Sequence, residues 1–153
     1  MYEKLRKIRE ERAEGDRGFT LIELLVVVVI IGILIAIAIP LYLNYQKGAK
    51  DKSAQSDIRA AVTAYQQCYT DNANAYIVAA VTVSNSASYS VTCSGTVENI
   101  NLSSGTTLTY TSADGTSFQL AASNSGGHAS SAAGNVGGKK TYTYDSTVGG
   151  SIG

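Results

Sequence analysis

His128 is the only histidine of the chain, so acid–base or metal chemistry would have to depend on it. It lies in a Gly/Ser-rich segment, and Asp114 and Asp145 are not obviously near it. A Ser–His pair or a metal centre requires several such side chains in one constellation. The sequence therefore predicts no catalytic residue, no metal site and no cofactor, which argues against an enzyme.

The charged residues are few and unevenly distributed. Only 16% of the 153 residues are charged and the formal net charge is zero, which excludes a polyanion-binding protein driven by bulk charge. Residues 1–18 hold 6 of the 12 Lys and Arg. Lys139 and Lys140 are the only cations after Arg59, and paired lysines before a strand usually protect a sheet edge. A nucleic acid partner is therefore not expected for this chain alone.

A long apolar run follows residues 1–18, the charged head of the chain. Phe19–Leu43 contains 25 residues with a single charge, Glu23. As a helix it covers about 37 Å, enough to cross a bilayer. Six Lys and Arg precede the run and four follow it by residue 59, a bias that places the N-terminus in the cytoplasm. We expect a membrane-spanning helix over 19–43 and export of the residues beyond it.

The junction between head and apolar run carries a specific motif. It reads Gly18-Phe19-Thr20-Leu21-Ile22-Glu23-Leu24-Leu25, with Gly32 and Pro40 further on. This stretch resembles the N-terminus of type IV pilins and of the related type II secretion pseudopilins. The resemblance implies that a prepilin peptidase removes residues 1–18 as a leader, cutting between Gly18 and Phe19, and methylates the new Phe19 amine. It also implies an assembly ATPase, a platform membrane protein and other copies of the chain as partners.

Glu23 is a carboxylate within the apolar run and costs a few kcal/mol in lipid if it is charged and unpaired. After cleavage, the nearest candidate partner is the α-amino group of Phe19, in its own or a neighbouring subunit. Pairing with a neighbour would fix the axial register between subunits. The alternative is that Glu23 lies close enough to the helix end to reach the interface.

Gly32 and Pro40 weaken the helix between them, because Pro40 cannot donate a hydrogen bond to the carbonyl of Ala36. The resemblance implies that this stretch loses helical structure as the subunit leaves the membrane. A simple kink is the alternative.

Beyond Pro40 the helix is predicted to continue as an amphipathic half over 44–72. Apolar residues recur at steps of three and four, with most charges expected off this face. The apolar positions are Ile58, Ala61, Val62, Tyr65 and Tyr69, and the charged ones are Lys50, Asp51, Lys52, Asp57 and Arg59. The cluster Thr70-Asp71-Asn72 is a plausible stop.

Residues 73–153 are predicted to form an irregular connection, an antiparallel sheet and a C-terminal region. Strands are expected at 76–83, 89–93, 97–102, 106–111, 117–121 and 140–144. Leu108 and Tyr110 should face Phe118 and Leu120 across a turn that contains Asp114-Gly115. Residues 123–138 are expected to form a flexible surface loop. The predicted fold is α+β, the type IV pilin fold, with one long helix packed on about four strands.

Cys68 and Cys93 are the only cysteines. Neither has a basic neighbour in sequence or a Cys-x-x-Cys spacing, so a redox role is not favoured. Because exported thiols in a small domain usually pair, we expect a disulfide that joins residues 69–92 to the core. Two buried, unpaired thiols are the alternative.

The sequence is interpreted as a structural subunit that polymerises through its apolar helix into a surface filament for adhesion, motility or DNA uptake. A type II secretion pseudopilin is a second hypothesis, although such proteins often have a calcium site of several acidic residues near the C-terminus. Only Asp145 is acidic in the last 35 residues. A third hypothesis is a membrane-anchored binding module with a pilin-like N-terminus.

Overall fold

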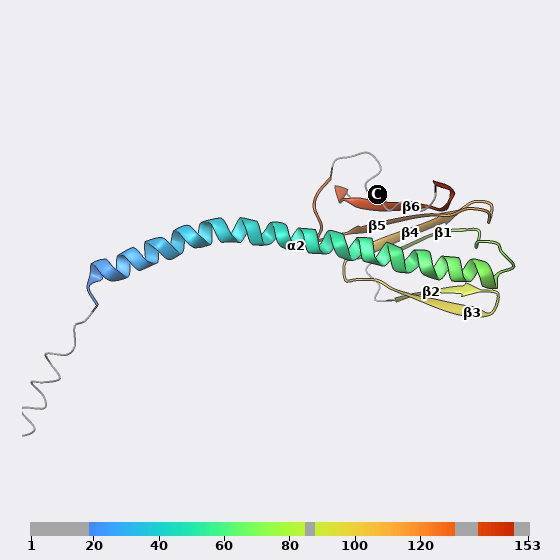
Figure 1. The fold of residues 1–153 in the computed structure, drawn as a ribbon, viewed down its shortest axis with the longest axis horizontal. Coiled ribbons are helices and arrows are strands. Elements are labelled where there is room, and N and C mark those ends of the chain that lie inside the picture. Colours follow the sequence, from blue (N-terminus) through green and yellow to red (C-terminus); the bar gives the residue numbers. More distant parts are fainter. Residues whose placement is uncertain (1–18, 85–87, 131–137, 149–153) are drawn as a thin grey trace, which may run out of the picture. The chain divides into compact units, whose positions relative to one another are not determined.

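The computed structural model describes residues 19–84, 88–130 and 138–148 (Figure 1). The described residues form one helix, six strands and a short 3₁₀ turn. In order these are α2 (Leu21–Asp71), β1 (Ala79–Ser84), β2 (Ser88–Cys93), β3 (Thr96–Asn101), β4 (Thr106–Ser112), β5 (Gln119–Asn124), β6 (Thr141–Asp145) and η2 (Ser146–Val148). The chain divides into two compact units, Met1–Leu41 and Tyr42–Gly153, and α2 contributes to both.

The first unit is helical from Leu21 onward, and its large apolar side chains are exposed. By length and composition, α2 can cross a membrane, and none of its most apolar window is buried in the protein. A helix is suited to lipid because it satisfies its backbone hydrogen bonds internally. The expected apolar helix over this stretch is confirmed.

In the second unit, α2 buries one face against the sheet. The buried helix residues are Asp51, Ala54, Asp57, Ile58, Ala61, Ala64, Tyr65 and Cys68. Ile58, Ala61 and Tyr65 confirm the expected apolar face, and the helix ends at Asp71 within the expected stop. The expected position of Asp51 and Asp57 off this face is wrong. Both are 5% exposed, because loops packed against the helix supply their hydrogen bonds.

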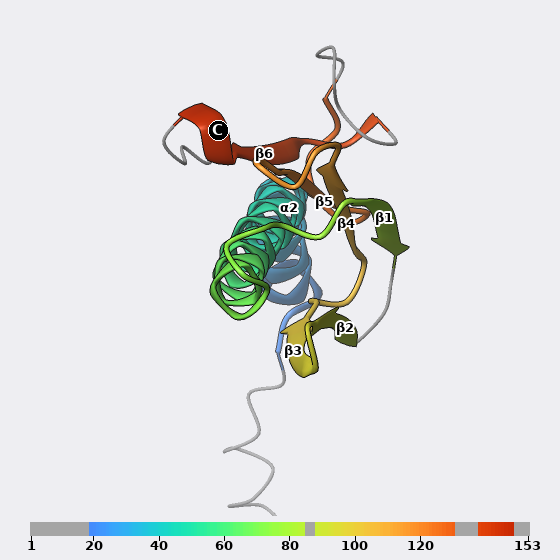
Figure 2. The ribbon, with the colours of Figure 1, turned by 90° about the vertical axis from the view of Figure 1, so that its right-hand side faces the viewer.

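The main sheet has four antiparallel strands in the order β1-β4-β5-β6. The expected hairpin forms between β4 and β5, with Tyr110 opposite Leu120. The rest of the expected pairing is wrong, because Leu108 lies opposite Ala122 and Phe118 precedes β5. Its turn contains Gly115 at φ +74°, a conformation that glycine adopts without strain. Viewed along α2, the strands β4, β5 and β6 lie on one side of the helix (Figure 2).

Strands β2 and β3 form a separate two-stranded hairpin. The hairpin lies between β1 and β4 in the sequence, and β4 pairs with β1 in the main sheet. The expectation of about four strands describes the main sheet, and the β2–β3 hairpin is additional. The observed strands lie within a few residues of the predicted ones. The largest differences are at the start of β1, which begins at Ala79, and at the end of β5, which extends to Asn124.

Aromatic side chains fill the core between helix and sheet. The rings of Tyr65 and Tyr110 stack with their centroids 3.8 Å apart and 8° between their planes. Phe118 lies within ring contact of Tyr76 and Tyr144, at 4.6 and 5.4 Å. Burial raises the pKa of the Tyr65 hydroxyl above its usual range. The cluster joins α2 to β4, β5 and β6 in one core.

Candidate functional site

The helix begins with a reciprocal pair of hydrogen bonds between Thr20 and Glu23. The backbone N–H and the hydroxyl of Thr20 both donate to Glu23 Oε2, each at 2.8 Å. In return, the backbone N–H of Glu23 donates to Thr20 Oγ1 at 3.3 Å. This is a capping box, in which a threonine and a glutamate three residues later satisfy free N–H groups at a helix start. The carboxylate is therefore held at the N-terminal end of α2, where the helix dipole favours negative charge.

The structure gives Glu23 a partner that was not anticipated from the sequence. The expected partner was the amine of Phe19, whereas Thr20 supplies the bonds within the described chain. The spacing Thr-x-x-Glu directly before an apolar run is the signal that could have identified it. Phe19 precedes the helix and is 88% exposed, and Gly18 lies outside the described residues.

Gly32 and Pro40 both lie inside α2. Gly32 has open space around its Cα, with nothing within 4 Å of an added β-carbon. Pro40 has no N–H for the carbonyl of Ala36. The helix nevertheless runs through both positions, so its weak stretch is helical in this state.

Asp57 holds the loop after β3 against the helix. Its two carboxylate oxygens accept hydrogen bonds from the backbone N–H and the hydroxyl of Ser103, both at 2.9 Å. The loop then turns through a bond from Thr106 N–H to the Ser103 carbonyl. A buried carboxylate on the apolar face is thus satisfied by a residue 46 positions away.

Asp51 holds the loop after β5 against the helix in the same way. His128 donates its backbone N–H to Asp51 Oδ1 at 3.1 Å, and its Nδ1 lies 2.6 Å from Asp51 Oδ2. A β-carbon at Gly127 would collide with this carboxylate, so glycine permits the close approach. His128 is therefore paired with a helix residue, a partner that was not anticipated from the sequence. The described first part of the 123–138 segment packs on α2, and residues 131–137 lie outside the description.

Replacing Asp57 by alanine is expected to lower the free energy of unfolding by about 2 kcal/mol, since the Ser103 N–H and hydroxyl lose a charged acceptor. Thermal unfolding of the full chain in detergent measures this loss. The matched control is Arg59→Ala, which removes an exposed charged side chain two residues further along the same helix. Equal stability of the Asp57 and Arg59 variants would contradict the role given to Asp57.

Cys68 of α2 and Cys93 at the end of β2 form a disulfide, as expected from the sequence. Their Cα atoms are 5.3 Å apart, and each cysteine is 1% exposed. The bond closes a loop of 25 residues in sequence that contains β1 and β2. It therefore attaches the β2–β3 hairpin, which pairs with no strand of the main sheet, to the helix.

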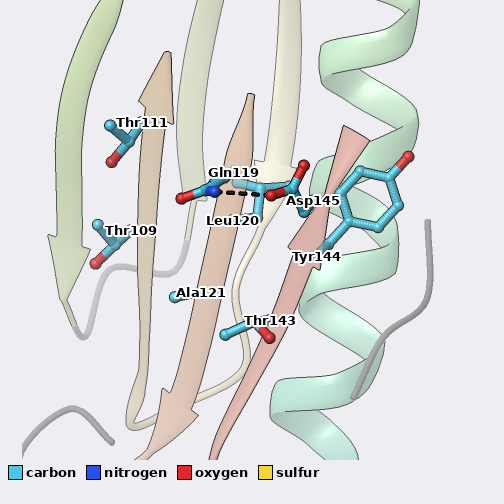
Figure 3. A pocket seen from close by; sticks show the side chains of 8 residues that line it. All are labelled: Thr109, Thr111, Gln119, Leu120, Ala121, Thr143, Tyr144 and Asp145. Carbon is cyan, nitrogen blue, oxygen red and sulfur yellow. Dashed lines mark hydrogen bonds between the residues drawn. The ribbon is translucent and has the colours of Figure 1, made fainter. Parts of the chain in front are cut away.

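The outer face of the sheet carries a shallow groove of about 320 Å³ (Figure 3). Gln119 Nε2 donates to Asp145 Oδ2 at 2.7 Å across β5 and β6. The remaining lining is Thr109, Thr111, Leu120, Ala121, Thr143 and Tyr144. The residues of this groove include no nucleophile beside a base, and the described residues contain no group of three or more metal-ligating side chains.

Comparison with known proteins addresses the N-terminal segment. Residues 15–39 match a family described as the prokaryotic N-terminal methylation motif. The type IV major pilin protein PilA of Myxococcus xanthus is 46% identical over 56 residues, which is 37% of this chain and 26% of that protein. The N-terminal segment of this chain is similar to that of type IV pilins. It is joined to an α+β unit of one long helix and a small antiparallel sheet.

Two further relatives match the same N-terminal segment. The type IV major fimbrial protein FimA of Dichelobacter nodosus is 48% identical over 60 residues, 39% of this chain and 38% of that protein. The type II secretion system core protein G of Pseudomonas aeruginosa is 46% identical over 55 residues, 36% and 39% of the two chains. The matched segment thus spans between a quarter and two fifths of these relatives. No solved structure matches the chain significantly.

Proposed function

We propose that the chain is the structural subunit of a type IV pilus, and that it has no enzymatic role. The observation that carries this proposal is the conjunction of a methylation motif over 15–39 with an exposed apolar helix that the protein itself does not cover. Exposed apolar surface of this extent requires lipid or other apolar helices around it. A membrane before assembly and a filament core after assembly supply the two environments.

In this proposal residues 1–18 form a cytoplasmic leader. A prepilin peptidase cuts between Gly18 and Phe19 and methylates the Phe19 amine, and the unit beyond Leu43 faces the outside. The motif match and the apolar run directly after Gly18 support this processing. An assembly ATPase and a platform membrane protein then move the subunit from the bilayer into a homopolymer.

Cleavage would create a positive charge one residue before Thr20. The new amine of Phe19, in its own or a neighbouring chain, pairs with Glu23, whose carboxylate the capping box already holds at the helix end. Pairing with a neighbour sets the axial offset of successive subunits. A charge pair also removes the cost of a lone carboxylate in an apolar core.

The stretch between Gly32 and Pro40 is proposed to change during assembly. It lacks one backbone hydrogen bond at Pro40 and contains a residue of low helix propensity, so it is the part of α2 with the least resistance to unwinding. Unwinding would lengthen this stretch between the membrane-derived core and the unit beyond it.

A type II secretion pseudopilin is the second candidate, because core protein G of Pseudomonas aeruginosa matches the same segment. Surface filaments sheared from cells that contain this chain would favour the pilus. Loss of protein secretion without loss of surface filaments, on deletion of the gene, would favour the pseudopilin.

Leader cleavage is tested by Gly18→Asp. We expect this variant to accumulate in the membrane with residues 1–18 still attached, because a larger side chain at the cut site blocks the peptidase, and to form no filaments. Immunoblotting resolves the two lengths. Gly15→Asp is the matched control in the leader and should be processed normally. Cleavage of the Gly18 variant at the wild-type rate would contradict the assigned site.

A further inference from the structure

The lysines of the unit Tyr42–Gly153 gather at one end of it. The basic end consists of Lys47, Lys50, Lys52, Lys139 and Lys140. The first three belong to the early turns of this part of α2 and are exposed. Lys139 Nζ donates to the carbonyl of Gly127 at 3.3 Å, and the adjacent His128 docks on Asp51 of the same turns. Residues far apart in sequence thus form one positive surface.

Acidic residues gather at the opposite end. The acidic end consists of Asp71, Glu98, Asp114 and Asp145. Asp71 is the last residue of α2, 24 positions after Lys47, or about 36 Å along the helix. The hydroxyl of Thr96 donates to Asp71 at 3.1 Å, so β3 begins beside the helix end, with Glu98 two residues further on.

Contacts of the main sheet bring the other two carboxylates to this end. Tyr76, just beyond α2, donates its N–H to the carbonyl of Gly115, next to Asp114 in the β4–β5 turn. Asp145 lies opposite Gln119 at the start of β5. Bonds from the Thr116 backbone and from the Thr147 hydroxyl hold the pKa of Asp114 and of Asp145 below the ordinary value.

Within the described part of this unit no Lys or Arg belongs to the acidic end, since none occurs in residues 60–138 and Lys139 and Lys140 belong to the basic end. The carboxylates near the basic end do not offset that surface either. Asp51 and Asp57 are buried and are satisfied by His128 and Ser103. The unit therefore has two exposed ends of opposite charge.

We propose that the acidic end of one copy docks on the basic end of the next copy along the filament, an inference that rests on the proposed function. A contact between two different surfaces of one chain repeats head to tail without closing, as a filament requires. Complementary charge selects this orientation and suppresses the reversed one. A nucleic acid would explain the lysines alone, whereas a second copy explains both ends.

The test reverses each end in the full chain, in cells with the assembly machinery. The first variant is Lys47→Glu/Lys52→Glu, the second is Asp71→Lys/Glu98→Lys, and the third combines all four changes. Arg59→Glu is the control, an exposed charge reversal between the two ends. Sheared filaments are quantified after confirming equal membrane levels and an intact disulfide.

Each end reversal is expected to reduce filaments at least about tenfold, while the combined variant recovers to within about threefold of wild type, because the paired charges attract again. Arg59→Glu should assemble normally. A combined variant as defective as its parents overturns the docking proposal. So does a first variant that assembles normally and loses binding to DNA. Absence of filaments from wild-type cells would instead overturn the proposed function itself.

Discussion

Glu23→Ala is expected to leave the chain inserted in the membrane and to reduce surface filaments more than tenfold. Charged hydrogen bonds contribute about 1.5–3 kcal/mol each, and about 1.4 kcal/mol corresponds to a factor of ten. The variant loses the carboxylate that we propose as the partner of the Phe19 amine, together with the capping box at Thr20. Because every subunit in the polymer carries the change, the loss recurs at each contact.

Membrane fractionation measures whether the Glu23 variant is inserted, and shearing of surface filaments measures how much of it assembles. Val29→Ala is a suitable control, since it alters a side chain of the same exposed apolar segment without removing a charge. Normal piliation by the Glu23 variant would show that this carboxylate does not set the subunit register.

The second large effect is expected from removal of the disulfide in Cys68→Ala/Cys93→Ala. For a loop of 25 residues, chain entropy predicts a loss of about 3.5 kcal/mol in unfolding free energy. For a unit of this size, that corresponds to a fall of about 15 °C in Tm. The β2–β3 hairpin should loosen first, because this bond attaches it to α2.

Thermal unfolding of the full chain in detergent, followed by circular dichroism, measures the change. Wild-type protein should resist mild reductant at room temperature, because both cysteines are 1% exposed. It should show the lowered Tm once it has been unfolded and refolded under reducing conditions. An unchanged Tm in the double variant would mean that the bond contributes nothing to stability.

Local patterns predicted the long helix and the central hairpin. Steps of three and four between Ile58, Ala61 and Tyr65 report directly which face of a helix is apolar. Asp114-Gly115 supplied the turn chemistry between two alternating strands, and Gly115 has the positive φ that such turns use. The pairing of Cys68 with Cys93 followed from having only two cysteines, both on the segment that was expected to be exported.

Long-range contacts account for what the patterns missed. Asp51 and Asp57 looked like surface charges because their partners, His128 and Ser103, lie 77 and 46 residues away. The strand order was missed for the same reason, because it depends on a long-range contact. Strand β1 pairs with β4, and the β2–β3 hairpin between them lies outside the main sheet. The Thr20–Glu23 capping box was a local signal, but a carboxylate in an apolar run had suggested the Phe19 amine of the same or a neighbouring subunit as its partner.

Intact-mass spectrometry of sheared surface filaments tests most directly whether this chain is a processed, polymerised pilin. The mass should correspond to a chain that begins at Phe19, carries one added methyl group, and lacks two hydrogens because Cys68 and Cys93 are joined. Fragmentation should place the methyl group on the Phe19 amine. Filaments that lack this chain, or a surface form that retains residues 1–18, would contradict the account.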